Sequence, residues 1–295
     1  MLKHIRTVLI IFASALPIIA IAPTREGFDL VKALYTTKKL TSKYTNEVDM
    51  EITFKPTRFS PVSIFSANLA EKALGSISET GNHTSPTLAH SSALAQSITF
   101  PASKRCDIYA SAQTFEQQTG AYAQLKSSIA DDQLRWTYVL LHEQAHCLWN
   151  AALVAENFLL LEQKTKDIYS SREYYLAQHL GEAYADAYAL TVLLQKRPDT
   201  SEGLATMLAN WRNATTTAKM PHRTIATLAL TETSITEQQN EIQNFTQMHA
   251  FASKISIAGM YHWLLDQGIS HEIAREDVER MQKIIESKYK VLEPK

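Results

Sequence analysis

The sequence predicts an α+β fold that is mostly helical, with a small sheet placed before one long central helix. Glycine is scarce, at 8 of 295 residues, while alanine, leucine, glutamine and glutamate fill long unbroken stretches, which favours helices. From about residue 128 onward the pattern is helix after helix, with breaks near Pro198, Pro221 and Gly268. Strand-like alternation occurs only before that point, so a single α+β domain is the simplest arrangement.

Two short segments predict the sheet. Residues 47–54, EVDMEITF, alternate in polarity, which would place every second side chain on one face of a strand. Residues 106–110, CDIYA, have the character of a second short strand. We therefore expect one domain over residues 25–295, with a mixed α/β part over 25–125 and a helical part over 128–295.

The N-terminus carries the only information about location. Lys3 and Arg6 precede an uncharged run at residues 8–22, VLIIFASALPIIAIA, which is typical of an export signal. The run ends in a small-x-small pattern, but Pro23 follows it directly and disfavours cleavage there. Residues 1–22 are thus a signal peptide or an N-terminal membrane anchor. In both cases the rest of the chain is expected to be exported, to the periplasm or the extracellular space.

The charge balance argues against one class of partner. Lysine and arginine number 29 and aspartate and glutamate 30, so no excess of positive charge is present to attract nucleic acid. A nucleic-acid partner is therefore not expected.

The central helix is expected to begin near Asp131 or Asp132, either of which can cap its first turn. It contains the motif HEQAH, in which His142 and His146 are four residues apart. That spacing places both imidazoles on one helix face, about 6 Å apart along the axis, where they can converge on one metal ion. Glu143 lies about 100° around the helix, outside the ligand positions but within reach of a water molecule beside the ion.

These residue types match the chemistry of a hydrolytic zinc site. Zinc lowers the pKa of a water ligand toward ~7, and an adjacent carboxylate accepts the proton as the oxygen attacks a carbonyl. The surrounding helix is apolar, and two histidines and a glutamate buried there without a partner would be costly. The sequence therefore predicts a Zn2+ cofactor, with Glu143 as the catalytic base.

A third protein ligand is needed, and it has to come from elsewhere in the chain. The extended pattern HExxHxxGxxH is excluded, because Trp149 and Ala152 occupy its glycine and third histidine positions. Glu182 and Asp186 share one face of a later helix, in GEAYADAYAL, whose alanines permit close helix packing. His179, one turn before Glu182, is an alternative ligand, although a supporting or surface position is the favoured interpretation.

The combination of HExxH with a later ExxxD helix resembles the gluzincin metallopeptidases, the broad thermolysin-like group. The EAxAD sequence is similar to that of the HtpX-like and prenyl-protein-processing branch. The resemblance implies that His142, His146 and Glu182 are the zinc ligands, that Glu143 is the general base, and that Asp186 orients His142 from behind.

The resemblance covers residues 131–190 or somewhat less, and the chain departs from the HtpX-like pattern in having one apolar N-terminal segment instead of several spans. In the thermolysin-like enzymes a downstream histidine donates to the oxyanion of the attacked carbonyl. His222, in KMPHRTIATL, is the candidate here, with Arg223 as an alternative donor and surface positions for both as the other interpretation.

The expected function is that of a zinc-dependent endopeptidase acting on a protein or peptide substrate. The alternative is a non-catalytic zinc-binding or structural helical protein that retains the motif, and Glu143 favours the enzyme, since a binding site has no need of a base there. A metal-dependent hydrolase of a non-peptide bond is a third option that is compatible with the motif. An extended substrate would pair with an exposed strand edge, and residues 108–111 are the expected edge.

The two cysteines of the chain provide a further expectation. Cys106 begins the proposed edge strand and Cys147 directly follows the second histidine ligand. In an oxidising compartment a bridge between them would tie strand to helix, whereas Cys147 as a buried apolar side chain is the alternative.

Overall fold

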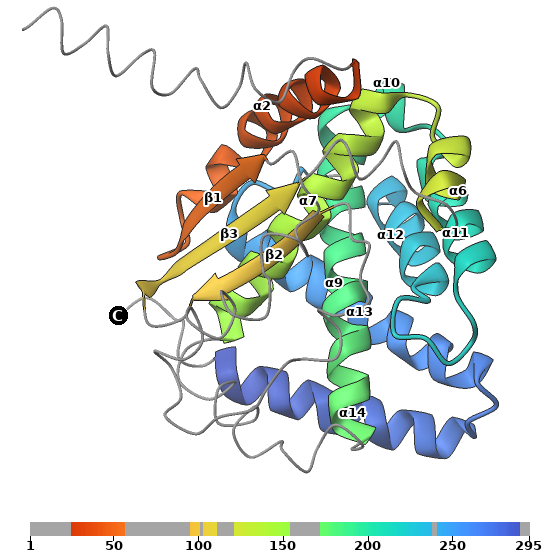
Figure 1. Ribbon diagram of the computed structural model, residues 1–295. Helices are drawn as coiled ribbons and strands as arrows, with labels where there is room; N and C mark the ends of the chain where they lie inside the picture. The colour runs from red at the N-terminus through yellow and green to blue at the C-terminus, as the bar shows by residue number, and fades with distance from the viewer. Residues whose placement is uncertain are drawn as a thin grey trace, which may run out of the picture.

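The computed structural model describes residues 25–56, 95–100, 103–110, 121–153, 172–237 and 241–289. Figure 1 shows the elements in their spatial arrangement, with the sheet against one side of a group of helices. In chain order the elements are α2 (Arg25–Thr45), β1 (Glu51–Pro56), β2 (Ala95–Phe100), β3 (Arg105–Ala110), α6 (Ala121–Ser128), α7 (Asp132–Leu153), α9 (Arg172–Lys196), α10 (Pro198–Ser201), α11 (Leu204–Thr215), α12 (Ile225–Glu237), α13 (Phe245–Asp266) and α14 (His271–Tyr289).

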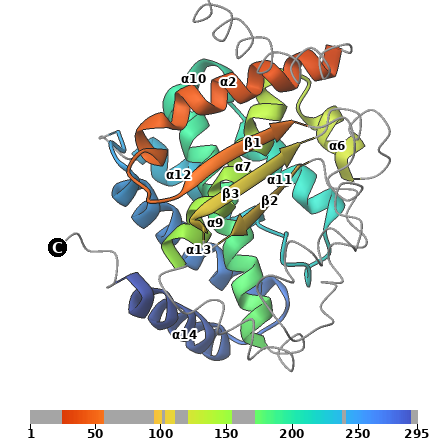
Figure 2. The ribbon, with the colours of Figure 1, turned by 60° about the vertical axis from the view of Figure 1, so that its left-hand side comes forward.

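The predicted fold class is confirmed, because the described residues are mostly helical and the sheet precedes the helix that carries the HExxH motif. The sheet has the strand order β1-β3-β2. β1 runs parallel to β3, whereas β2 runs antiparallel to it (Figure 2). Ile52 lies opposite Cys106, and Ser97 lies opposite Ile108. The middle strand is therefore the one that follows the other two in the sequence.

The first strand begins later than the alternation of residues 47–54 indicates. α2 ends at Thr45, and the amide N–H groups of the next three residues donate back to carbonyls in its last turn. These residues therefore complete the end of the helix instead of joining the sheet. Strand pairing starts at Glu51, opposite Arg105.

α7 is the central element of the molecule. Its first turn is capped as expected, since Asp131 Oδ1 accepts a hydrogen bond of 2.9 Å from the N–H of Leu134. From Leu134 to Trp149 most of its side chains are buried, and the helix packs against β2 and β3 on one side and against α2 and α9 on others. The polar side chains of α7 can therefore reach solvent or a ligand only between these neighbouring elements.

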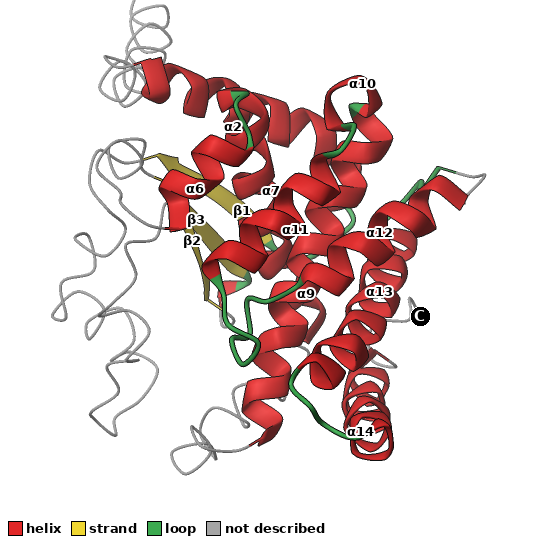
Figure 3. Cartoon of the chain, turned by 90° about the vertical axis from the view of Figure 1, so that its right-hand side faces the viewer, coloured by secondary structure: helices red, strands yellow, loops and turns green. Residues whose placement is uncertain are grey.

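α9 packs along α7 and forms the other half of the site. Ala183, Ala185, Ala187 and Ala189 are all buried, so small side chains let the two helices approach closely, as the sequence predicts. α12 and α13 pack against α9, and α11 packs against α12, on the side away from the sheet (Figure 3). The expected breaks are confirmed, with Pro198 opening α10, Pro221 between α11 and α12, and Gly268 in the left-handed region after α13.

The segment interpreted as a signal or anchor, residues 1–22, lies outside the described residues. Within the residues that are described, no helix combines the length and apolar character needed to cross a bilayer. Export and anchorage stay predictions from the sequence.

Candidate metal centre

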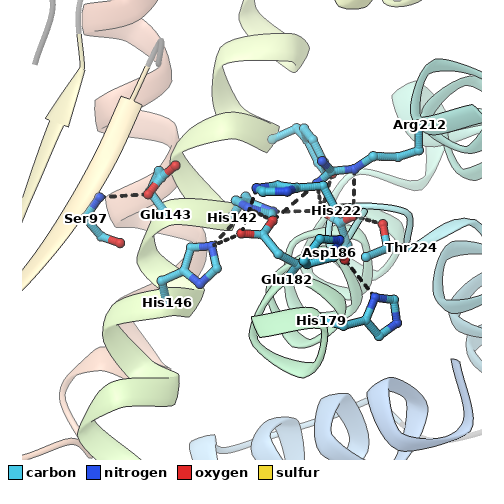
Figure 4. A network of polar contacts seen from close by, with 12 residues as sticks. Ser97, His142, Glu143, His146, His179, Glu182, Asp186, Arg212, His222 and Thr224 are labelled. Carbon is cyan, nitrogen blue, oxygen red and sulfur yellow. Dashed lines mark hydrogen bonds and ion pairs between the residues drawn. The ribbon is translucent and has the colours of Figure 1, made fainter. Parts of the chain in front are cut away.

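The structure brings the three predicted ligands together between α7 and α9. His142 and His146 project from α7 and Glu182 from α9, and one atom of each lies within 4.8 Å of the others (Figure 4). The two Nε2 atoms are 3.1 Å apart, and they lie 3.4 and 3.6 Å from the Glu182 carboxylate oxygens. The side chains are 12%, 21% and 16% exposed, so the group is largely buried but open on one side.

This triangle has the dimensions of a zinc site. Four ligand atoms arranged tetrahedrally at ~2.0–2.1 Å from zinc are separated from one another by about 3.3 Å. The Nε2–Nε2 separation of 3.1 Å lies close to that value, and so do the two Nε2–oxygen separations of 3.4 and 3.6 Å, which end on the two different oxygens of Glu182. Glu182 Oε2 is buried and has no hydrogen-bond partner among the described residues. A bound cation would supply the partner that this oxygen lacks. Two imidazole nitrogens and a carboxylate oxygen therefore fit the ion, and they leave a fourth position for water or substrate.

Asp186 stands behind His142, as the resemblance implies. Its Oδ1 lies 2.7 Å from His142 Nδ1, so this nitrogen donates its proton to the carboxylate and Nε2 is left as the ligand atom. The contact determines both the tautomer of His142 and the orientation of its ring. Asp186 thus prepares His142 to bind a metal ion through Nε2.

Asp186 accepts more hydrogen bonds than the sequence indicates. Tyr138 donates its hydroxyl at 2.5 Å, Arg212 donates from Nε and from a terminal nitrogen at 3.1 and 2.9 Å, and the Thr224 hydroxyl donates as well. These donors come from α7, from α11 and from the start of α12, so the carboxylate joins three elements. Sequence reasoning missed all three donors. One signal was present, because Arg212 is a lone cation on the apolar face of α11.

The charges of the centre depend on one another. Burial by itself would raise the pKa of Asp186, but the Arg212 guanidinium and His142 hold it well below its usual range. Burial would likewise raise the pKa of Glu182, which His222 and the two ligand histidines lower instead. Burial opposes the charged form of His142, but Asp186 and Glu182 raise its pKa to about 10. In the metal-free protein a proton on His142 therefore supplies positive charge between two carboxylates, and an incoming cation has to displace it.

Glu143 lies beside the triangle on the side of the sheet. Its Oε2 accepts a hydrogen bond of 2.8 Å from the backbone N–H of Ser97 in β2 (Figure 4). The carboxylate is not among the grouped ligand atoms, as its position on the helix predicts. Its orientation is controlled by the neighbouring strand, which the sequence did not indicate.

His222 reaches the centre from the loop between α11 and α12. Its Nε2 lies 3.3 Å from Glu182 Oε1, and its side chain is 58% exposed, so the imidazole lies between the ligand group and the solvent. Arg223 points elsewhere and donates to the Thr216 carbonyl at 3.1 Å and to Asn213 Oδ1 at 2.9 Å. Of the two oxyanion donors considered from the sequence, the structure places His222 at the site and Arg223 in the support of its loop.

His179 is not a ligand in the described structure. It is buried, and its Nδ1 lies 2.7 Å from the carbonyl oxygen of Pro221. Its ring is stacked on Trp263, with ring centroids 3.8 Å apart. Of the two interpretations of His179 from the sequence, metal ligand or supporting residue, the structure therefore agrees with the supporting residue.

The predicted substrate-aligning edge at residues 108–111 was wrong. β3 is the middle strand and pairs with β1 on one side and β2 on the other, so it presents no edge. The reason is visible in its burial, since Cys106, Asp107 and Ile108 are buried in succession, which is typical of an interior strand. β2 is the strand whose outer side faces Glu143.

Of the two alternatives left open for the cysteines, the structure shows the bridge. Cys106 of β3 is bonded to Cys147 of α7, with a Cα separation of 5.7 Å. Because Cys147 follows His146 directly, the bridge attaches the ligand helix to the middle of the sheet. It also closes a loop that contains the α6 segment.

Comparisons with protein-family models, with curated proteins and with solved structures found no match to this chain.

Proposed function

We propose that the protein is a zinc-dependent endopeptidase. The observation that carries this proposal is the His142, His146 and Glu182 triangle, whose edges suit a tetrahedral zinc ion, with a carboxylate at Glu143 beside it. A zinc site that only binds or stabilises has no need of a base in that position. A binding-only site would also be served by four protein ligands, whereas three are grouped here among the described residues.

Each residue of the centre has a distinct part in the proposed reaction. A zinc ion, when bound by the triangle, polarises oxygen ligands and makes water nucleophilic near neutral pH. Glu143 accepts the proton of the attacking water and then transfers it to the leaving amine. His222 lies on the open side of the triangle and donates to the oxygen of the attacked carbonyl as negative charge develops there. Asp186 keeps His142 in the tautomer that leaves its Nε2 available.

The proposed substrate is an extended polypeptide that lies along β2. Among the described residues β3 is the strand that pairs with β2, which leaves the side of β2 toward Glu143 without a strand partner. A peptide pairing on that side would pass directly beside the triangle. N-methylation of the peptide nitrogens that flank the scissile bond is then expected to raise KM, and an unchanged KM would contradict pairing with β2.

The test of the proposed function compares the wild-type chain with Glu143→Gln, both loaded with zinc, on an unstructured, alkylated polypeptide. We expect Glu143→Gln to bind zinc normally and to lower kcat/KM by ~10²–10⁴, the contribution usual for a general base. Glu173→Gln is the matched control, because Glu173 is a half-exposed carboxylate paired with Arg280 away from the centre. A zinc-loaded wild-type chain that cleaves no peptide bond, or equal activity in Glu143→Gln, would refute the proposal.

A further inference from the structure

The loop that carries His222 joins α11 to α12. Within it the Met220 N–H donates to the Thr217 carbonyl, and the Arg223 N–H donates to the Met220 carbonyl, both at 3.0 Å. These turns shape the loop, but they make no contact with α9, where Glu182 is located. The position of His222 over the metal centre therefore depends on side chains from outside the loop.

Two adjacent residues at the α12 end of the loop hold it to neighbouring elements. Arg223 donates to the Thr216 carbonyl and to Asn213, which secures the loop to the end of α11. The next residue, Thr224, donates from its hydroxyl to Asp186 in α9. Neither contact reaches the peptide unit that leads into His222.

His179 makes that contact. Its Nδ1 lies 2.7 Å from the Pro221 carbonyl oxygen, which belongs to the peptide bond between Pro221 and His222. Since a carbonyl only accepts, His179 is the donor. Burial lowers the pKa of His179 to about 4, so at neutral pH the ring is uncharged and its single proton is on Nδ1. His179 is one helical turn before Glu182, and the same helix thus holds both the ligand and the loop above it.

Packing alone does not account for a histidine at this position. The ring is stacked on Trp263 with an interplanar angle of 3°, a contact that an apolar aromatic ring would make equally well. His179 Nε2 is buried and has no hydrogen-bond partner among the described residues, which is a cost that such a ring would avoid. The bond from Nδ1 to the Pro221 carbonyl is the contact that only the imidazole provides.

We infer that His179 is a positioning residue for His222: the buried imidazole holds the Pro221 carbonyl and so keeps His222 on the open side of the metal centre. The effect of His179 on turnover rests on the proposed function, whereas its effect on the loop does not. Trp263 maintains the plane of the ring, and Nδ1 supplies the directional contact.

Two variants of His179 separate the donor from the stacking. His179→Phe keeps an aromatic ring against Trp263 but lacks the donor, whereas His179→Asn has an amide nitrogen close to the place of Nδ1 but lacks the ring. His249→Phe is the matched control, because His249 is also a buried imidazole, bonded to Tyr184 at 2.9 Å away from the loop. Should His179→Phe not fold, the comparison of His179→Asn with His179→Ala decides the same question.

The first measurement is hydrogen exchange of residues 217–223 in the full chain, which needs no enzymatic activity. We expect exchange there to rise in His179→Phe by ~10-fold or more, as the loop opens locally, and to stay near the wild-type rate in His179→Asn and His249→Phe. Unchanged exchange in His179→Phe, or an equal rise in His249→Phe, would overturn the inference.

The second measurement is kcat and KM on the unstructured polypeptide. His179→Phe is expected to lower kcat by ~10-fold, less than the ~10²–10³ typical for loss of an oxyanion donor, and to have no further effect in a His222→Ala background. A full independent loss in that background would show that His179 does not act through His222, and would overturn the inference. If the wild-type chain has no peptidase activity the proposed function fails, and the exchange measurement still decides whether His179 positions the loop.

Discussion

At the residue scale, Asp186 is the side chain on which the polar contacts of the centre converge. It accepts from His142, from Tyr138, from Thr224 and twice from Arg212, and it is fully buried. A buried carboxylate with this many donors is stable as an anion, because each donor favours the charged form. It therefore controls both the ligand nitrogen of His142 and the distance between α9 and α11.

Asp186→Asn is expected to weaken zinc binding without removing a ligand. The amide removes the negative charge that favours donation from Nδ1 of His142 and leaves Arg212 buried beside a neutral group, so zinc affinity should fall by about 10–100-fold. The measurement is competition with a chromophoric chelator. Asp277→Asn is the control, since Asp277 is also a buried carboxylate but pairs with Arg172 and Arg280 in another part of the molecule. Equal zinc affinity in wild type and Asp186→Asn would show that Asp186 has no part in the centre.

The backbone N–H of Ser97 provides a second test at this scale. Proline is tolerated on an edge strand where its missing N–H faces away from the neighbouring strand, and the Ser97 N–H faces Glu143. Ser97→Pro removes a hydrogen bond to a charged group, which is worth about 1.5–3 kcal/mol, so we expect kcat to fall by roughly 10–100-fold with zinc retained. Ser97→Ala keeps the N–H and should be close to wild type. If Ser97→Pro and Ser97→Ala lost activity equally, the Ser97 side chain or the integrity of β2 would be responsible, and the role of the N–H would be refuted.

At the element scale, close helix contacts depend on glycine and alanine. At Gly259 in α13 an added Cβ would lie 2.0 Å from Thr227 Oγ1 and 3.1 Å from the Thr227 backbone in α12. The helices therefore meet at a point where no side chain fits.

Gly259→Ala is expected to reduce the free energy of unfolding by about 1–3 kcal/mol, because the two helices have to move apart. Gly181→Ala is a matched control inside another helix, since its added Cβ would meet Trp149 Nε1 at 3.8 Å, an ordinary contact. That control should be neutral or slightly stabilising, owing to the better helix propensity of alanine. Urea denaturation of both variants checks the prediction, and similar midpoints for the two would contradict it.

The elements of the site differ in how far the sequence predicts them. The spacing of His142 and His146 on an apolar helix, and of Glu182 and Asp186 on an alanine-rich one, indicates both helices and the faces that meet, because helical periodicity is local information. The order of the strands is not local, and the interior position of β3 could not be read from residues 106–110. Arg212 approaches Asp186 from a different helix, and only its isolation on an apolar face hinted at a buried partner.

At the scale of the whole molecule, buried neutral histidines make stability depend on pH. Burial lowers the pKa of His249 to about 4, compared with ~6.5 for imidazole in an unfolded chain. A base whose pKa is lowered by folding contributes stability above the unfolded value, and this contribution is lost as the pH falls from 6.5 through 4. For His249 the loss at pH 5 is about 2 kcal/mol. His179 shares the same direction and cause.

His249→Phe should therefore show two opposite effects. At pH 7 it is expected to be less stable than wild type by about 1 kcal/mol, because the hydrogen bond with Tyr184 is lost. Between pH 7 and pH 5 it should lose about 2 kcal/mol less than wild type. Urea titrations at the two pH values measure the difference, and parallel losses in the two proteins would contradict a neutral buried imidazole.

Zinc binding by the triangle is tested by the zinc content of the purified full chain after dialysis against a weak chelator. We expect one zinc per chain in wild type and in Glu143→Gln, because Glu143 lies beside the ligand group and not in it. We expect His146→Ala and Glu182→Ala to lose the metal, since each removes one corner of the triangle. A wild-type chain without stoichiometric zinc, or a Glu182→Ala chain that keeps it, would show that His142, His146 and Glu182 do not form a zinc site.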